Sequence, residues 1–205
     1  MAALRKKNIP AAWLLAGPVA LGLWATDRSW LGRVGRHADI RRLSNFGEPF
    51  DALWGQLRRA PGRLRAVRTA AALDWRFGDL LCKRQAAVLG LFQGERLEGY
   101  VILRETTREH LGLRQFVIAD LQALDDSPDR VTALLQAALD ATRHAGVDAL
   151  EWQGWNSEKR KIAEGFYPRS YRYPTWPLFY KTVNPDIAPI MARPGSWDFS
   201  PFDAF

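Results

Sequence analysis

The chain has 205 residues, of which 47% are hydrophobic and 25% charged, and its net charge is +7. This length and apolar content suffice for one well-buried domain, and no low-complexity tract indicates disorder. A single cysteine, Cys82, excludes an internal disulfide and a cysteine-rich zinc site, and it favours a reducing compartment. The basic residues are spread along the chain without a helix-turn-helix, RNA-binding or zinc pattern, so the charge does not favour nucleic acid. The one dense basic stretch, residues 58–68, fits either a phosphate site or, as we expect, a solvated face.

The first 42 residues are predicted to form a basic and apolar segment outside the domain. An apolar run over 9–25 follows a basic start, as in a signal sequence, but it is shorter than the roughly 20 residues that cross a bilayer and it contains prolines. Three interpretations stay open: a membrane-surface anchor, an uncleaved signal-like segment, and an apolar helix that packs on a partner or a further domain. We expect a cytoplasmic protein, with peripheral contact at the inner face of the membrane as the alternative.

Regular structure is expected from Glu48 onward. A helix is predicted over 48–60, because four apolar residues fall at i, i+3, i+4 and i+7, namely Phe50, Leu53, Trp54 and Leu57. A short strand over 64–70 and a short helix over 71–81 follow. Residues 85–105 then show two apolar runs around a four-residue turn that contains a glycine, which is typical of a β-hairpin.

The clearest helix is predicted over 128–145, after a strand over 114–124. Ser127 is expected to cap it, Pro128 suits its first turn, and Gly146 ends it. Its buried stripe is predicted to comprise Val131, Leu134, Leu135, Ala138 and Leu139. The remaining predicted elements are a strand over 148–155, a helix over 156–166 and a strand region over 170–182.

The order of these elements predicts an α/β (α+β) fold with a mixed, mostly antiparallel central sheet flanked by helices. A mostly antiparallel start followed by one strand-helix-strand crossover resembles the GNAT acetyltransferase fold. Gly165 and Phe166 resemble the glycine-phenylalanine pair that closes the last helix in GNAT proteins. The resemblance covers roughly residues 43 to 183 and so divides the chain into an N-terminal segment over 1–42, a GNAT-like domain over 43–183 and a tail over 184–205.

A second resemblance is to the opening of the second half of bacterial tandem GNAT-like proteins, which are linked to exopolysaccharide or cellulose production. It is carried by a Leu-x-Trp-Arg-aromatic element, here Leu73, Trp75, Arg76 and Phe77. The side chains of Trp75 and Phe77 are expected to pack in the core, as large aromatics usually do.

The resemblance also locates a cofactor loop. GNAT enzymes usually hold the pyrophosphate of acyl-CoA with a glycine-rich loop between the fourth strand and the next helix. The resemblance implies that Leu121, Gln122 and Ser127 are the cofactor-binding residues of this chain. Asp125 and Ser127 occupy the glycine-type positions, and Asp126 adds a second carboxylate. Two negative charges would repel a pyrophosphate, and a Cβ would block close approach of the backbone, so the loop is predicted to be degenerate.

The catalytic groups are also incomplete. The general-acid tyrosine of many GNAT enzymes stands four residues before the glycine-phenylalanine pair, where this chain has Lys161. Asp120 and Glu151 are candidate general bases, because a carboxylate beside a strand splay can take a proton from an amine through water. Each also fits an ordinary rim carboxylate. The three histidines pair with neither Cys82 nor a serine at a recognisable spacing, so metal and triad chemistry are not predicted.

Two functions therefore stay open. The first is an acyltransferase that moves an acyl group from acyl-CoA to a sugar or cell-envelope precursor. The second is a non-catalytic half that docks on a catalytic GNAT-like domain or on another copy of itself. Fold resemblance alone does not decide between them.

Overall fold

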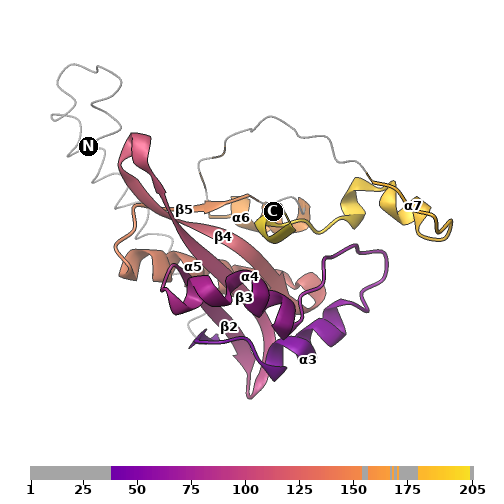
Figure 1. Cartoon of the computed structure of the whole chain (residues 1–205), viewed down its shortest axis with the longest axis horizontal. Coiled ribbons are helices and arrows are strands. Elements are labelled where there is room, and N and C mark those ends of the chain that lie inside the picture. Colours follow the sequence, from indigo (N-terminus) through magenta and orange to yellow (C-terminus); the bar gives the residue numbers. More distant parts are fainter. Residues whose placement is uncertain (1–37, 154–156, 167, 169, 171–179, 204–205) are drawn as a thin grey trace.

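A five-stranded sheet in the order β1-β2-β3-β4-β5 forms the centre of the molecule (Figure 1). The computed structural model describes residues 38–153, 157–166, 168, 170 and 180–203. The strands are β1 (Asp39–Leu43), β2 (Ala86–Gln93), β3 (Arg96–Arg108), β4 (Leu113–Ala123) and β5 (Ala149–Trp152). The first four strands pair antiparallel, and β4 pairs parallel with β5. The predicted mixed, mostly antiparallel sheet is therefore confirmed.

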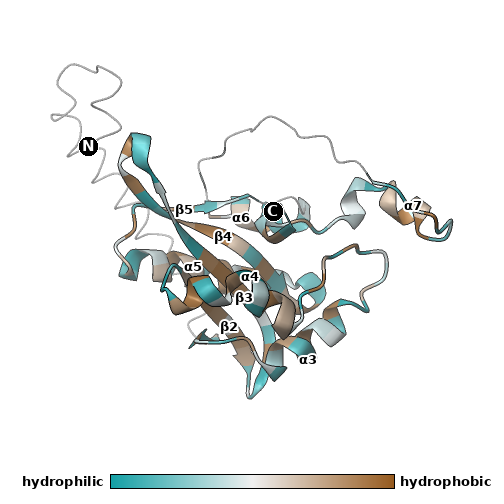
Figure 2. Cartoon of the chain, in the orientation of Figure 1, coloured by the Kyte–Doolittle hydropathy of each residue, from teal (hydrophilic) through white to brown (hydrophobic). Residues whose placement is uncertain are grey.

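Helices cover both faces of this sheet (Figures 1 and 2). α3 (Glu48–Leu57) and α4 (Ala70–Cys82) pack on one face, and α5 (Pro128–His144) packs on the other. The alternation along β3 divides the core accordingly, because Tyr100 faces α3 and α4 whereas Val101 faces α5. Two further α-helices lie within the described residues: α6 (Ser157–Glu164), which packs against α5, and the single-turn α7 (Ala188–Met191).

Periodicity identified most elements correctly, and the exceptions have physical causes. The predicted strand over 64–70 is wrong: residues 65–69 form an irregular connection, Leu64 makes one isolated bridge with Trp197, and Ala70 begins α4. Strand β1 was not predicted, because it is short and carries three charged residues. The predicted strand over 170–182 lies largely outside the described residues, and the apolar run over 9–25 lies wholly outside them. No helix in the part of the chain that the structure describes is long and apolar enough to span a membrane.

The two aromatic side chains of α4 take opposite environments. Phe77 is 3% exposed and packs in the core, as predicted, whereas Trp75 is 83% exposed, so its predicted burial is wrong. The two residues are two positions apart, which on a helix places their side chains on different faces. Only one of them can therefore face the sheet.

The α5 helix confirms most of its predicted stripe. Val131, Leu134, Leu135 and Ala138 are buried, whereas Leu139 is half-buried and Thr142 takes the next buried position. Ser127 is the residue before the helix, but its side chain makes no capping hydrogen bond, so this part of the prediction is wrong. Its backbone carbonyl accepts the hydrogen bond of the Val131 N–H at 2.9 Å.

Replacing Leu135 with Ala is expected to lower the free energy of unfolding by about 2–5 kcal/mol, because the side chain is 5% exposed and its removal leaves a cavity against the sheet. Leu139→Ala, at a half-buried position on the same helix, should cost clearly less. Urea denaturation of both variants measures the difference. An equal loss in the two variants would contradict the assigned face.

A charged candidate site beside strand β4

A β-bulge places the first charged residue of the site. Ile102 of β3 pairs with Asp120 and Leu103 pairs with Ile118, so Ala119 is an extra residue in β4. The Asp120 side chain consequently points to the face covered by α3 and α4, where the Tyr100 hydroxyl donates a hydrogen bond to its Oδ2 at 2.8 Å. The bulge thus places a carboxylate inside the apolar core.

Arg68, from the connection between α3 and α4, neutralises this carboxylate. Its Nε donates to Asp120 Oδ2 at 2.9 Å, and both side chains are 0% exposed. Gln122 Nε2 and Ser200 Oγ donate to the other carboxylate oxygen at 3.2 and 2.9 Å. Burial alone would raise the pKa of Asp120, but the Arg68 charge and the hydrogen bonds from Arg68, Tyr100 and Ser200 hold it below its ordinary value. Asp120 is therefore an ionised, fully paired carboxylate.

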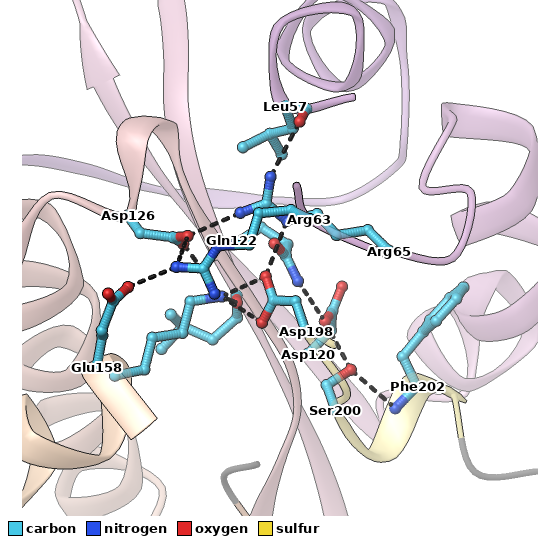
Figure 3. Close-up of polar contacts among 12 residues, drawn as sticks. Leu57, Arg63, Arg65, Asp120, Gln122, Asp126, Glu158, Asp198, Ser200 and Phe202 are labelled. Carbon is cyan, nitrogen blue, oxygen red and sulfur yellow. Dashed lines mark hydrogen bonds and ion pairs between the residues drawn. The ribbon is translucent and has the colours of Figure 1, made fainter. Parts of the chain in front are cut away.

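A second group of charges lies at the start of α5 (Figure 3). We call Arg65, Asp126, Lys159 and Asp198 the ion cluster. Arg65 donates to both carboxylates, from Nη2 to Asp126 and from Nε to Asp198, each at 2.8 Å. Lys159 Nζ lies 3.2 Å from Asp198 and 3.4 Å from Asp126. The cluster joins two cations to two anions, and each of its side chains is at most 10% exposed.

The pKa of Asp198 shows how the cluster is balanced. Burial raises this pKa, but the charges of Lys159 and Arg65 and their hydrogen bonds outweigh that effect and lower it below the ordinary value of 3.8.

Arg63 and Glu158 pair with each other at the rim, and Arg63 also lies 3.4 Å from Asp126. The Lys159 Nζ additionally donates to the backbone carbonyl of Leu121, in β4, at 3.1 Å.

The loop from β4 to α5 has the backbone shape of a glycine loop without the glycines. Asp125 and Asp126 have φ of 58° and 47°, in the left-handed region that glycine adopts most readily and that aspartate tolerates better than most residues. The Asp125 side chain points to solvent, whereas that of Asp126 enters the ion cluster. Carboxylates thus stand where the loop would otherwise present bare backbone.

The predicted site residues are only partly brought together. Asp120, Leu121 and Gln122 lie beside the charged groups just described, and Ser127 begins α5. Glu151 lies apart, at the paired end of β4 and β5, where Arg108 and Gln115 donate to its Oε2 at 2.5 and 2.8 Å. Burial raises its pKa, but these hydrogen bonds and one from Gln153 hold it below the ordinary value. The catalytic and cofactor-binding roles of these residues stay predictions.

Two residues central to the site, Lys159 and Asp198, were missed from the sequence, and two more, Arg65 and Arg68, were noted only as part of the basic stretch. The dense basic stretch over 58–68 was the available signal, but the expectation of a solvated face is wrong for Arg65 and Arg68, whose side chains are 4% and 0% exposed. Arg58 and Arg59 are exposed, as expected. No group of three or more His, Cys, Asp or Glu residues within the described ranges could hold a metal ion.

Comparison with solved structures identifies the fold as that of GNAT acetyltransferases. A ribosomal-protein-alanine N-acetyltransferase from Brucella melitensis biovar Abortus 2308 superposes with a TM-score of 0.51 at 19% identity, covering 71% of this chain and 100% of its own. Glucosamine-6-phosphate N-acetyltransferase from Arabidopsis thaliana gives 0.51 at 13% identity, with coverage of 71% and 100%. No family model and no curated protein sequence gives a significant match.

A third similar structure bears on the cofactor. It is a predicted acetyltransferase from Clostridium acetobutylicum with acetyl-CoA, which superposes with a TM-score of 0.51 at 10% identity over 69% of this chain and 96% of its own. At the start of α5 of the present chain, the buried cations are already paired with carboxylates of the same chain. Arg65 and Lys159, which would suit a pyrophosphate, are neutralised by Asp126 and Asp198, and the Lys159 ammonium also takes the Leu121 carbonyl.

Arg68→Ala is expected to lower the free energy of unfolding by about 3–5 kcal/mol, because it leaves Asp120 charged and fully buried without its cation. Arg59→Ala removes an exposed arginine from the same stretch and should change stability by no more than about 0.5 kcal/mol. Chemical denaturation monitored by tryptophan fluorescence measures both. A cost below about 1 kcal/mol for Arg68→Ala would show that this pair does not hold the connection in place.

Acid is expected to destabilise the fold below the ordinary aspartate pKa of 3.8. The pKa values of Asp120 and Asp198 are lowered in the folded state, so their contribution is complete above 3.8 and is lost as the pH falls through the lowered values. Asp203 acts in the opposite direction, because burial raises its pKa more than Arg68 lowers it. Thermal melting between about pH 6 and pH 2 should give a smaller loss for Asp198→Asn than for wild type. Asp186→Asn, at an exposed position, should keep the wild-type loss.

Proposed function

We propose that this chain is a GNAT-fold domain that does not use acyl-CoA in the ordinary way and that acts as a non-catalytic half beside a catalytic GNAT-like domain. One observation carries the proposal: Arg65 and Lys159, the buried cations nearest the start of α5, are held by the chain's own Asp126 and Asp198. A phosphate group would have to displace two buried carboxylates to reach them.

The candidate proton-transfer groups support the same function. A general base works best when its pKa lies near the working pH, whereas the pKa values of Asp120 and Glu151 are both lowered by their partners. Asp120 also has no solvent exposure. At the position of the general-acid tyrosine, α6 carries the exposed Lys161. We infer that these carboxylates stabilise the fold rather than transfer protons.

A docking role needs an exposed surface, and we place this surface at the exposed aromatic residue of α4. Trp75 is 83% exposed on this helix, and Val67, in the connection before it, is 57% exposed. Exposed aromatic residues are frequent anchors of protein interfaces. Trp75 also belongs to the element that resembles tandem GNAT-like proteins, so we propose a catalytic GNAT-like domain of a cytoplasmic exopolysaccharide or cell-envelope system as its partner.

An acyltransferase is the second candidate, and one observation favours it. Asp125 and Asp126 keep the left-handed backbone conformation that a glycine loop would use. The backbone could then receive a phosphate once the Asp126 carboxylate had moved. Binding measurements separate the two functions.

Isothermal titration with acetyl-CoA and longer acyl-CoAs is expected to show no saturable binding up to millimolar concentration. Asp126→Gly should bring measurable binding, because it frees Arg65 and Lys159 from one carboxylate and relieves a strained φ. Asp125→Gly relieves the same strain at an exposed position that contacts neither cation, and it should bring less. The Clostridium acetobutylicum protein is the positive control. Micromolar binding by the wild type, weakened by Asp126→Gly, would contradict the proposed function.

A further inference from the structure

Residues 196–203, which we call the C-terminal strap, are held to the domain by backbone contacts at one end. The Leu64 N–H donates to the Ser196 carbonyl at 2.7 Å, and the Asp198 N–H donates to the Leu64 carbonyl at 3.0 Å. These two hydrogen bonds pair the strap in parallel with the connection between α3 and α4. The main chain at this end of the strap thus pairs with the connection through one parallel bridge, which is the contact that strand addition repeats in peptide recognition.

Acidic side chains supply the specific contacts of the strap, and Figure 3 shows one of them, Asp198. Asp198 is 3% exposed and lies between Arg65 and Lys159 in the ion cluster. Asp203 receives a hydrogen bond from Arg68 Nη2 at 3.0 Å, and Ser200 Oγ donates to the buried Asp120 at 2.9 Å. Each carboxylate of the strap therefore meets a buried cation that comes from outside the strap.

An aromatic anchor completes the far end. The Arg68 guanidinium lies 4.7 Å above the ring centroid of Phe202, and that ring lies 5.9 Å from the ring of Phe77 in α4. Cation–π contact with a desolvated arginine and contact with a core aromatic both hold the half-buried Phe202 ring in place. The strap thus combines backbone, ionic and aromatic contacts, as a bound peptide does.

The chain just before the strap makes few contacts with the domain. Val183 is 94% exposed, and most of residues 183–195 are exposed. α7 lies at the outer edge of the molecule in Figure 1, away from the sheet. The strap is therefore fixed by its own contacts rather than by the segment that leads to it.

From these contacts we infer that the domain has a binding site for an acidic, aromatic peptide of the pattern Trp-Asp-Phe-Ser-Pro-Phe-Asp, and that the strap is its ligand in cis. The site is formed by Leu64, Arg65 and Arg68 of the connection, with Lys159 of α6 and Phe77 of α4. It takes the same segment as a separate peptide once the covalent link is opened. The inference does not depend on the proposed function, since it concerns the peptide and not acyl-CoA.

The test uses the full-length chain with a specific-protease site inserted after the exposed Val183. Before cleavage, a fluorescent peptide of residues 184–205 is expected not to bind, because the strap in cis has an effective concentration in the millimolar range. After cleavage, the released fragment should co-elute with the folded domain and then exchange with the labelled peptide. Exchange measured by fluorescence anisotropy would support the site.

Peptide variants show whether the ionic contacts carry the recognition. A peptide with Asp198→Asn should bind weaker by on the order of 30-fold or more, because it leaves Arg65 and Lys159 short of one buried carboxylate. The matched control, Asp186→Asn, changes an exposed aspartate of the same peptide and should bind as tightly as wild type. Equal binding by the two variants would overturn the assigned recognition.

Two further outcomes are decisive. Loss of the fragment after cleavage with no uptake of peptide by a domain that stays folded would overturn the inference. If the cleaved domain precipitates, the uncleaved Asp198→Asn chain replaces it, because its own strap is weakened while the site is unchanged. That chain should bind the wild-type peptide, and a failure to bind would also overturn the inference.

Discussion

The buried carboxylate of Asp120 is the constraint on which the arrangement around β4 depends. A bulge at Ala119 turns this carboxylate into an apolar core, where an unpaired charge would cost several kcal/mol. Arg68 is the cation that meets it, but a guanidinium has five N–H donors that also need acceptors. The Ala66 carbonyl, Ser200 and Asp203 accept those hydrogen bonds. One buried charge thus fixes both the connection before α4 and the end of the chain.

The backbone carbonyl of Leu121 in β4 also needs a hydrogen-bond donor. β5 pairs with β4 only as far as Trp152 opposite Ile118, so β4 runs on beyond its parallel partner in the described part of the sheet. The Leu121 carbonyl there accepts from Lys159, and the buried ammonium in turn needs carboxylates, which Asp126 and Asp198 provide. The chain therefore satisfies this carbonyl of β4 with one of its own side chains.

The fold was largely predictable from the sequence because its signals are local. The apolar stripe of α5 and the turn at Gly94 act over a few residues, and both were found. The ion pairs were not predictable, because Arg68 and Asp120 are 52 residues apart and Arg65 and Asp198 are 133 apart. Residues 64–70 resembled a strand because their pattern does not show which side chains are buried. The buried ones are Arg65 and Arg68, whose ion-pair partners are distant in the sequence. The carboxylates of the loop were recognised, but the cations that bind Asp126 were not.

Charge, rather than apolar packing, is what gives this arrangement its specificity. An apolar cluster of equal volume could stabilise the start of α5 as well as the four ions do, and often better. It would, however, accept several orientations of the segments that meet there. Each ion of the cluster contacts partners from at least two segments, since Arg65 joins the loop before α5 to the strap and Lys159 joins β4 to both. Moving any one of these segments leaves a buried charge short of a partner, which is costly. The strap is a specific ligand for the same reason, because its carboxylates have to meet buried cations.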